Sequence, residues 1–169
     1  MKCGIRVRVC VNRIGRMAVT RRLLFVVVAG VLLGLPASAA EFRLRRFHAD
    51  LNAAGETALV SSPANGTADM ELEIQSLKLH WKLVFTGLTS EATEVALHGP
   101  AQPGANGIVQ LTLAPKGAKS PVEGTAVLNS AQAEYMLSGW TYVDIATVRY
   151  PKGEIRNQMK VQYPRDSDR

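Results

Sequence analysis

Two neighbouring stretches decide the fold: "TADMELEI" at residues 67–74 and "LKLHWKLVF" at residues 77–85. In both, apolar and polar residues alternate. Successive side chains of a strand point to opposite faces, so this alternation predicts two half-buried strands. The residues predicted to face inward are Ala68, Met70, Leu72, Ile74, Leu77, Leu79, Trp81, Leu83 and Phe85.

Strand-like segments recur along the rest of the chain, with breaks rich in Gly and Pro between them. The further strands are predicted at 42–49, 93–98, 107–113, 122–128, 140–149 and 154–163. One stretch differs. Residues 129–139 predict a helix of about two turns, with Asn129 or Ser130 as N-cap and Gly139 as stop. Eight short strands indicate a sandwich or barrel, and we predict an all-β fold, an antiparallel Greek-key-like β-sandwich with one short helix.

The first 40 residues have the pattern of a secretory signal peptide. Seven basic and no acidic residues precede the apolar run 23–35, and "ASAA" (37–40) offers cleavage after Ala39 or Ala40. A membrane anchor is disfavoured because 13 apolar residues are fewer than the roughly 17–25 of a spanning helix. We therefore expect a signal peptide at 1–40, a domain at 41–169 and a periplasmic or secreted protein. The start codon is either Met1 or Met17.

Removing the predicted signal changes the charge of the protein. The whole chain has a net charge of +6, but residues 41–169 carry 13 basic and 14 acidic residues, a net charge of −1. The basic character therefore gives no reason to expect nucleic acid as a partner. Both cysteines, Cys3 and Cys10, also lie in the signal, so the mature chain has neither a disulfide nor a thiolate metal site.

A family resemblance emerges from six segments that occur in order. They are "FRLRRFHADLNAAGE", "NGTADMEL", "LVFTGL", "ALHGPA", "LNSAQAEYMLSGWTYVDIAT" and "YPKGEIRNQM". Over residues 42–161 the chain resembles the CHRD (chordin-type) domain. The resemblance implies an extracytoplasmic β-sandwich from a family with no agreed enzymatic activity.

The chain departs from the family pattern at positions that could hold a metal. The family commonly has His-x-His-Gly-Pro where this chain has Ala96 and His98 before Gly-Pro, and a His-Thr pair where it has Ala146 and Thr147. Residues i and i+2 of a strand project from one face about 6.5–7 Å apart, so three such imidazoles could form a typical ligand set. His98, alone or with Asp144, supplies too few ligands. We predict no metal and no cofactor, with His98 as a hydrogen-bonding residue at a strand end.

The same alternation divides two strands into an inward and an outward face. Val95, Leu97, Val143 and Ile145 are predicted to point into the core. The predicted outward set is Ala96, His98, Tyr142, Asp144 and Ala146.

Glu154 and Arg156 are predicted to share the outward face of the last strand. The interpretation we favour is an exposed cross-strand ion-pair ladder, in which each pair contributes about 0–1 kcal/mol. The alternative is a recognition surface shared with Tyr142 and Asp144. His48, in a basic strand, has no evident acidic partner. The candidate binding residues are therefore His98, Tyr142, Asp144, Glu154 and Arg156.

Catalytic motifs are absent from the sequence: no Gly-x-Ser-x-Gly elbow, no His-Glu-x-x-His helix and no phosphate-binding glycine loop. We predict an exported, non-catalytic binding or structural module with a protein or envelope partner and no membrane span after signal cleavage. The alternative is a copper- or zinc-binding sandwich protein that uses His98, with a degenerate metal site.

Overall fold

The computed structural model describes residues 43–163, which form an all-β domain with one short α-helix. The predicted signal peptide and its cleavage sites lie outside the described residues. The strands are β1 (Leu44–Asn52), β2 (Asn65–Glu73), β3 (Lys78–Thr86), β4 (Ala92–Gly99), β5 (Ile108–Ala114), β6 (Val122–Val127), β7 (Tyr142–Thr147), β8 (Ile155–Gln158) and β9 (Lys160–Gln162). The helical elements are the 3-10 turn η1 (Ala53–Gly55) and the helix α2 (Ser130–Leu137). Within residues 43–163, no helix has the length and apolar character needed to cross a membrane.

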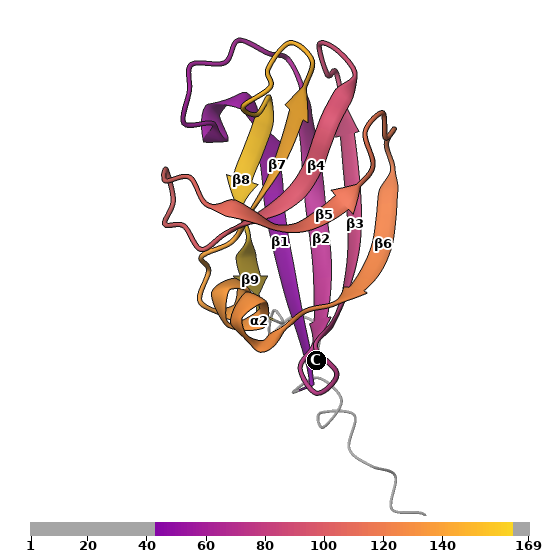
Figure 1. Ribbon diagram of the computed structural model, residues 1–169, viewed down its shortest axis with the longest axis vertical. Helices are drawn as coiled ribbons and strands as arrows, with labels where there is room; N and C mark the ends of the chain where they lie inside the picture. Colours follow the sequence, from indigo (N-terminus) through magenta and orange to yellow (C-terminus); the bar gives the residue numbers. More distant parts are fainter. Residues whose placement is uncertain (1–42, 164–169) are drawn as a thin grey trace, which may run out of the picture. The chain divides into compact units, whose positions relative to one another are not determined.

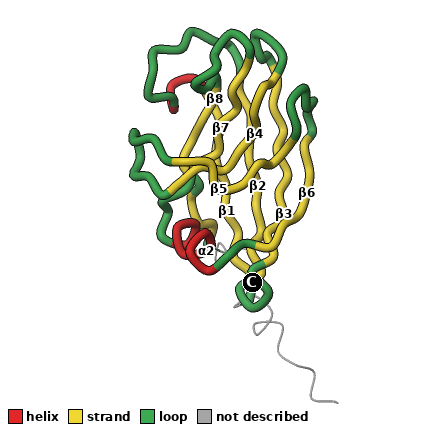
Figure 2. The backbone as a smooth tube through the Cα atoms, viewed as in Figure 1, coloured by secondary structure: helices red, strands yellow, loops and turns green. Residues whose placement is uncertain are grey.

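The strands form one antiparallel sheet in the order β5-β4-β7-β8-β1-β2-β3-β6, with β9 paired to β1. The sheet folds over so that its β5–β4–β7–β8 half faces its β1–β2–β3–β6 half (Figure 1). Strand β6 returns beside β3 after the excursion through β4 and β5, which is the Greek-key-like connection that we predicted. Figure 2 shows α2 at one end of this sandwich.

The core lies between the two halves and confirms the predicted strand faces. Met70, Leu79 and Leu83 are almost fully buried, and Trp81 is 8% exposed. Gly124 of β6 pairs with Trp81 of β3, and the indole lies where a side chain at position 124 would extend. A glycine is therefore required there by packing.

Three local features differ from the sequence prediction or go beyond it. The segment 154–163 was predicted as one strand, but it is split into β8 and β9 at Met159, whose backbone N–H donates to the Thr141 carbonyl. Met159 is buried, so the chain leaves the strand ladder to place this side chain in the core. Strand β1 runs on to Asn52, whose side chain then caps η1 by accepting from the Gly55 N–H. The predicted helix is present, and Asn129 caps it in a reciprocal capping box with Gln132.

Candidate functional site

Strand pairing brings four of the five candidate residues together. In the β4–β7 pair, His98 lies opposite Tyr142 and Ala96 opposite Asp144. In the β7–β8 pair, Asp144 lies opposite Arg156. The intervening Val95, Leu97, Val143 and Ile145 are fully buried in the core, as predicted. The four polar residues therefore share the outer face of the β4–β7–β8 sheet.

This outer face is covered, which corrects the expectation that it is exposed. Arg156 is 2% exposed and Asp144 7% exposed, and Tyr142 is equally hidden. The segments that follow β1 and β4 lie over the face. Gly55 lies against the Arg156 backbone, and Gly107 donates its N–H to the Tyr142 hydroxyl at 3.0 Å. Strand alternation indicates which face a residue occupies, but it carries no information about the loops that return over that face.

A stack of three side chains occupies the centre of the face. The His98 and Tyr142 rings lie 5.0 Å apart and nearly parallel, at 11°. The Arg156 guanidinium lies 3.4 Å from the centre of the Tyr142 ring, in cation–π geometry. Arg156 also donates to Asn106 Oδ1 at 2.7 Å and to the Ala105 carbonyl. All three side chains are thus held in fixed positions.

His98 hydrogen-bonds at the end of β4, as the sequence predicted. Its Nδ1 lies 3.3 Å from the Gly107 carbonyl oxygen. Burial lowers the pKa of His98, so the ring is neutral at neutral pH. Among the described residues, no group of three or more His, Cys, Asp and Glu side chains is placed to hold a metal ion.

A second carboxyl group, from Glu56, joins Asp144 beneath the covering segment. Asp144 Oδ1 and Glu56 Oε1 are both buried without a hydrogen-bond partner. Both carboxyl groups face Gly153, where an added Cβ would lie 2.6 Å from Glu56 Oε2 and 2.8 Å from Asp144 Oδ1. Burial, with a contribution from the Glu56 charge, raises the pKa of Asp144 to about 8, and burial raises the pKa of Glu56 to about 7. Sequence reasoning missed Glu56 because it lies in a loop, where no periodicity indicates its neighbours.

A small pocket opens beside this cluster. It has a volume of about 120 Å³. Its lining residues are Glu94, His98, Asp144, Ala146, Pro151 and Lys152. Carboxyl oxygens, an imidazole and an ammonium group can therefore all contact a polar group that enters the pocket.

Glu154 lies apart from the other four candidates. Its carboxylate accepts hydrogen bonds from Ser62 Oγ at 2.6 Å, from the Thr89 N–H at 2.8 Å and from Thr147 Oγ1 at 2.6 Å. Burial alone would raise the pKa of Glu154, but these hydrogen bonds lower it overall. Glu154 is 0% exposed, so the exposed ladder predicted for Glu154 and Arg156 is wrong. Its carboxylate instead ties three separate segments to the start of β8.

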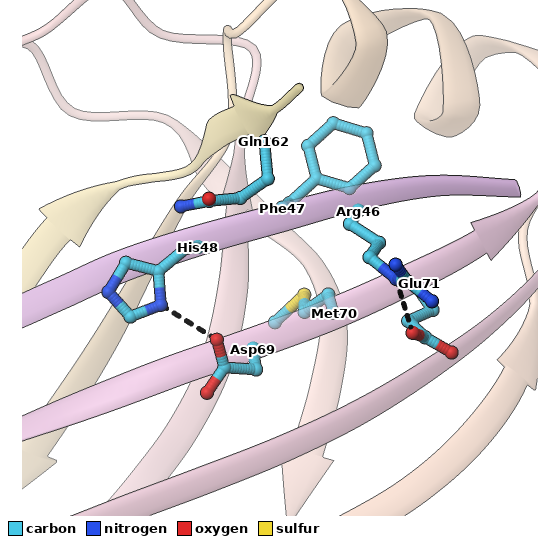
Figure 3. Close-up of a pocket in the computed structure, with 7 residues that line it drawn as sticks. All are labelled: Arg46, Phe47, His48, Asp69, Met70, Glu71 and Gln162. Carbon is cyan, nitrogen blue, oxygen red and sulfur yellow. Dashed lines mark hydrogen bonds and ion pairs between the residues drawn. The ribbon is translucent and has the colours of Figure 1, made fainter. Parts of the chain in front are cut away.

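A second depression, with a volume of about 490 Å³, lies on the outer face of β1, β2 and β9 (Figure 3). His48 has acidic partners there, contrary to expectation: its Nδ1 lies 2.7 Å from Asp69 Oδ1 and its Nε2 3.2 Å from Asp50 Oδ1. The hydrogen bond to Asp69 is the main reason that the pKa of His48 is raised. Arg46 pairs with Glu71 at 2.9 Å. The His48–Asp69 and Arg46–Glu71 pairs connect β1 to β2, and such partly exposed pairs contribute little to stability.

A comparison with models of protein families identifies the family to which the chain belongs. A family model described as the CHRD domain matches residues 47–159, more than half of the chain. The chain belongs to the CHRD-domain family. The match runs from β1 to Met159 and contains every candidate residue, including Glu56. No curated protein and no solved structure matches the chain. The CHRD domain is generally a non-catalytic module and is typically extracellular or secreted.

Proposed function

We propose that this CHRD-domain protein is exported to the periplasm or the cell exterior and acts there as a non-catalytic binding or structural module. Family membership supports both the location and the absence of catalysis. The signal-like residues 1–40 support export independently, because a basic start, an apolar run and small residues follow in the required order.

The binding face that we propose comprises His98, Tyr142, Asp144 and Arg156. The observation that carries it is the rigid His98–Tyr142–Arg156 stack beside a pocket lined by Asp144. Burying polar and charged groups costs stability unless each has a partner. The apolar core is sufficient to stabilise a β-sandwich, so stability alone does not explain this buried polar cluster. A preorganised polar cluster beside a pocket is instead what a binding site requires. Glu154 supports this face from the adjacent strand end and does not line the pocket.

The partner that we propose is a protein or another envelope component. The pocket is only large enough for a small polar group, such as one side chain of a larger partner. The exposed side chains at its rim, Pro151 and Lys152, would contact the partner around that group.

Site-specific photo-crosslinking in the native cell tests the binding face. A photoreactive residue at Lys152 should give a discrete adduct with a partner. The same residue at Lys82, exposed on β3 in the other half of the sheet, should not. Equal labelling from both positions, or none from Lys152, would contradict the proposed face.

Mass spectrometry of the exported protein tests its location. We expect a mature N-terminus at Ala40 or Glu41, because the small residues before each position fit signal cleavage. An intact N-terminus at Met1 or Met17, in protein recovered from the cytoplasm, would contradict export.

A further inference from the structure

The segment after η1 is fixed to the sheet by few contacts. Gly55 lies against the backbone of β8, and Ser61 accepts a hydrogen bond from the Tyr150 hydroxyl at 2.8 Å. Between these anchors, residues 57–59 are exposed, and Thr57 donates one hydrogen bond to Asn106 at 3.2 Å. Glu56 is the residue of this segment that reaches the buried Asp144. Figure 2 shows η1 as the short helical turn beside β8.

The charges around the two carboxyl groups do not neutralise them by direct pairing. The Arg156 charge on β8 lowers the pKa of both groups, but its guanidinium is engaged by Tyr142, Asn106 and Ala105. Across residues 43–163, neither Glu56 nor Asp144 forms an ion pair. The other titratable groups that face this site are Glu94 and His98 of β4, Tyr142 of β7 and Lys152 of the turn before β8.

Two carboxylates that each have a buried oxygen without a hydrogen-bond partner repel each other, and the Arg156 charge offsets this cost only in part. A single proton removes both costs, because one carboxyl then donates to the other. Gly153 leaves room for both groups, because a side chain there would overlap the carboxyl oxygens of each.

We propose that Glu56 and Asp144 retain at least one proton between them, and that the resulting hydrogen bond between the two carboxyl groups latches residues 56–60 over the outer face of β7 and β8. When alkaline pH removes the last proton to solvent, two negative charges face each other and the segment is released. An exported protein experiences the pH of its surroundings, so the latch couples external pH to the exposure of the part of the face that residues 56–60 cover. That the uncovered face binds a partner rests on the proposed function. The latch itself does not.

Hydrogen exchange tests the latch. Amide exchange of residues 53–60, corrected for the intrinsic effect of pH, should become at least tenfold faster between pH 6 and pH 9. Strand β3 should keep its protection over the same range. Equal protection of residues 53–60 at both pH values would overturn the proposal, and so would a segment already open at pH 6.

Substitutions identify the groups responsible. In Asp144→Asn or Glu56→Gln the amide can donate to the remaining carboxylate, so either variant should keep the segment closed and independent of pH. Glu56→Ala should leave it open at both values. Glu71→Gln alters an exposed carboxylate paired with Arg46, and it should retain the natural pH response. An unchanged response in either amide variant would overturn the proposal, and each serves if the other fails to fold.

Infrared spectroscopy observes the proton directly. The natural protein at pH 6 should show the carbonyl band of a buried protonated carboxyl group, and the double variant Glu56→Gln/Asp144→Asn should lose it. Absence of this band from the natural protein would overturn the proposed proton between the two groups. Crosslinking from Lys152 at both pH values separates the two proposals: a latch without adducts contradicts only the binding function, and adducts without a latch contradict only this inference.

Discussion

The fit between Trp81 and Gly124 gives a quantitative test of the core. An added Cβ at Gly124 would lie 2.7 Å from Trp81 Cε2 and closer still to the neighbouring ring carbon. Gly124→Ala should therefore overpack the core, at a cost of about 1–3 kcal/mol. Alanine is better than glycine in a strand by about 0.5–1 kcal/mol, which offsets part of that cost.

Replacing the indole should reverse the sign of the effect. Trp81→Leu removes the six-membered ring that the new methyl group would overlap. Alone it should cost about 2–4 kcal/mol, because the removed ring leaves a cavity. In that background Gly124→Ala should be neutral or stabilising by up to about 1 kcal/mol. The double-mutant cycle should thus give a coupling of about 1–3 kcal/mol between residues that face each other across one strand pair.

Urea denaturation followed by circular dichroism measures each corner of this cycle without depending on Trp81 fluorescence. Thr125→Ala is the matched control, because Thr125 follows Gly124 in β6 and is exposed on the opposite face. Its cost should be the same in both backgrounds. If Gly124→Ala costs the same amount with Trp81 as with Leu at position 81, within about 0.5 kcal/mol, the packing described for this face is wrong.

Three further predictions concern the polar residues. Glu154→Ala should destabilise the domain by about 3–5 kcal/mol in thermal or urea unfolding, because it leaves several buried donors without an acceptor. Between about pH 4 and pH 8, Asp144 keeps a proton in the folded state that the unfolded chain has lost, so its contribution makes the unfolding free energy fall as pH rises. Asp144→Asn should remove this contribution and stabilise the domain by about 1–3 kcal/mol at pH 8.5, which urea titrations at several pH values would measure. Ala146→His should place a second imidazole in the pocket beside His98 and raise zinc affinity by about tenfold or more in calorimetric titration, whereas an unchanged affinity would show that the two positions do not converge.

The sequence was most informative where a residue's environment follows from its own strand. Leu79, Trp81 and Leu83 alternate with histidine and lysine, so the geometry of the strand is enough to predict that all three side chains point into the core. The capping residue of α2 was similarly readable, because Asn129 and Gln132 interact within one turn. Both patterns depend on residues a few positions apart.

The sequence was least informative where burial depends on distant segments. Arg156 appeared exposed because its strand face alternates with the core, yet residues 105 and 106 bind its guanidinium from a loop 50 positions away. Glu154 was predicted to share an exposed face with Arg156, yet Ser62 and Thr89, 92 and 65 positions earlier in the chain, bind its carboxylate. Strand alternation carries no information about either contact.

The buried acids of the candidate site therefore define two different physical roles. Glu154 receives enough hydrogen bonds to remain ionised at 0% exposure, so its charge is compensated within the fold. Asp144 and Glu56 receive no such bonds at their buried oxygens, so their burial is compatible with at most one charge between them. A buried carboxylate with enough hydrogen-bond donors stays ionised, and its contacts hold, over a wide pH range. Contacts between two carboxyl groups that lack such donors depend on whether the groups are protonated. In the proposed latch, the outer face of β4, β7 and β8 therefore responds to the pH of its surroundings while the core beneath it stays unchanged.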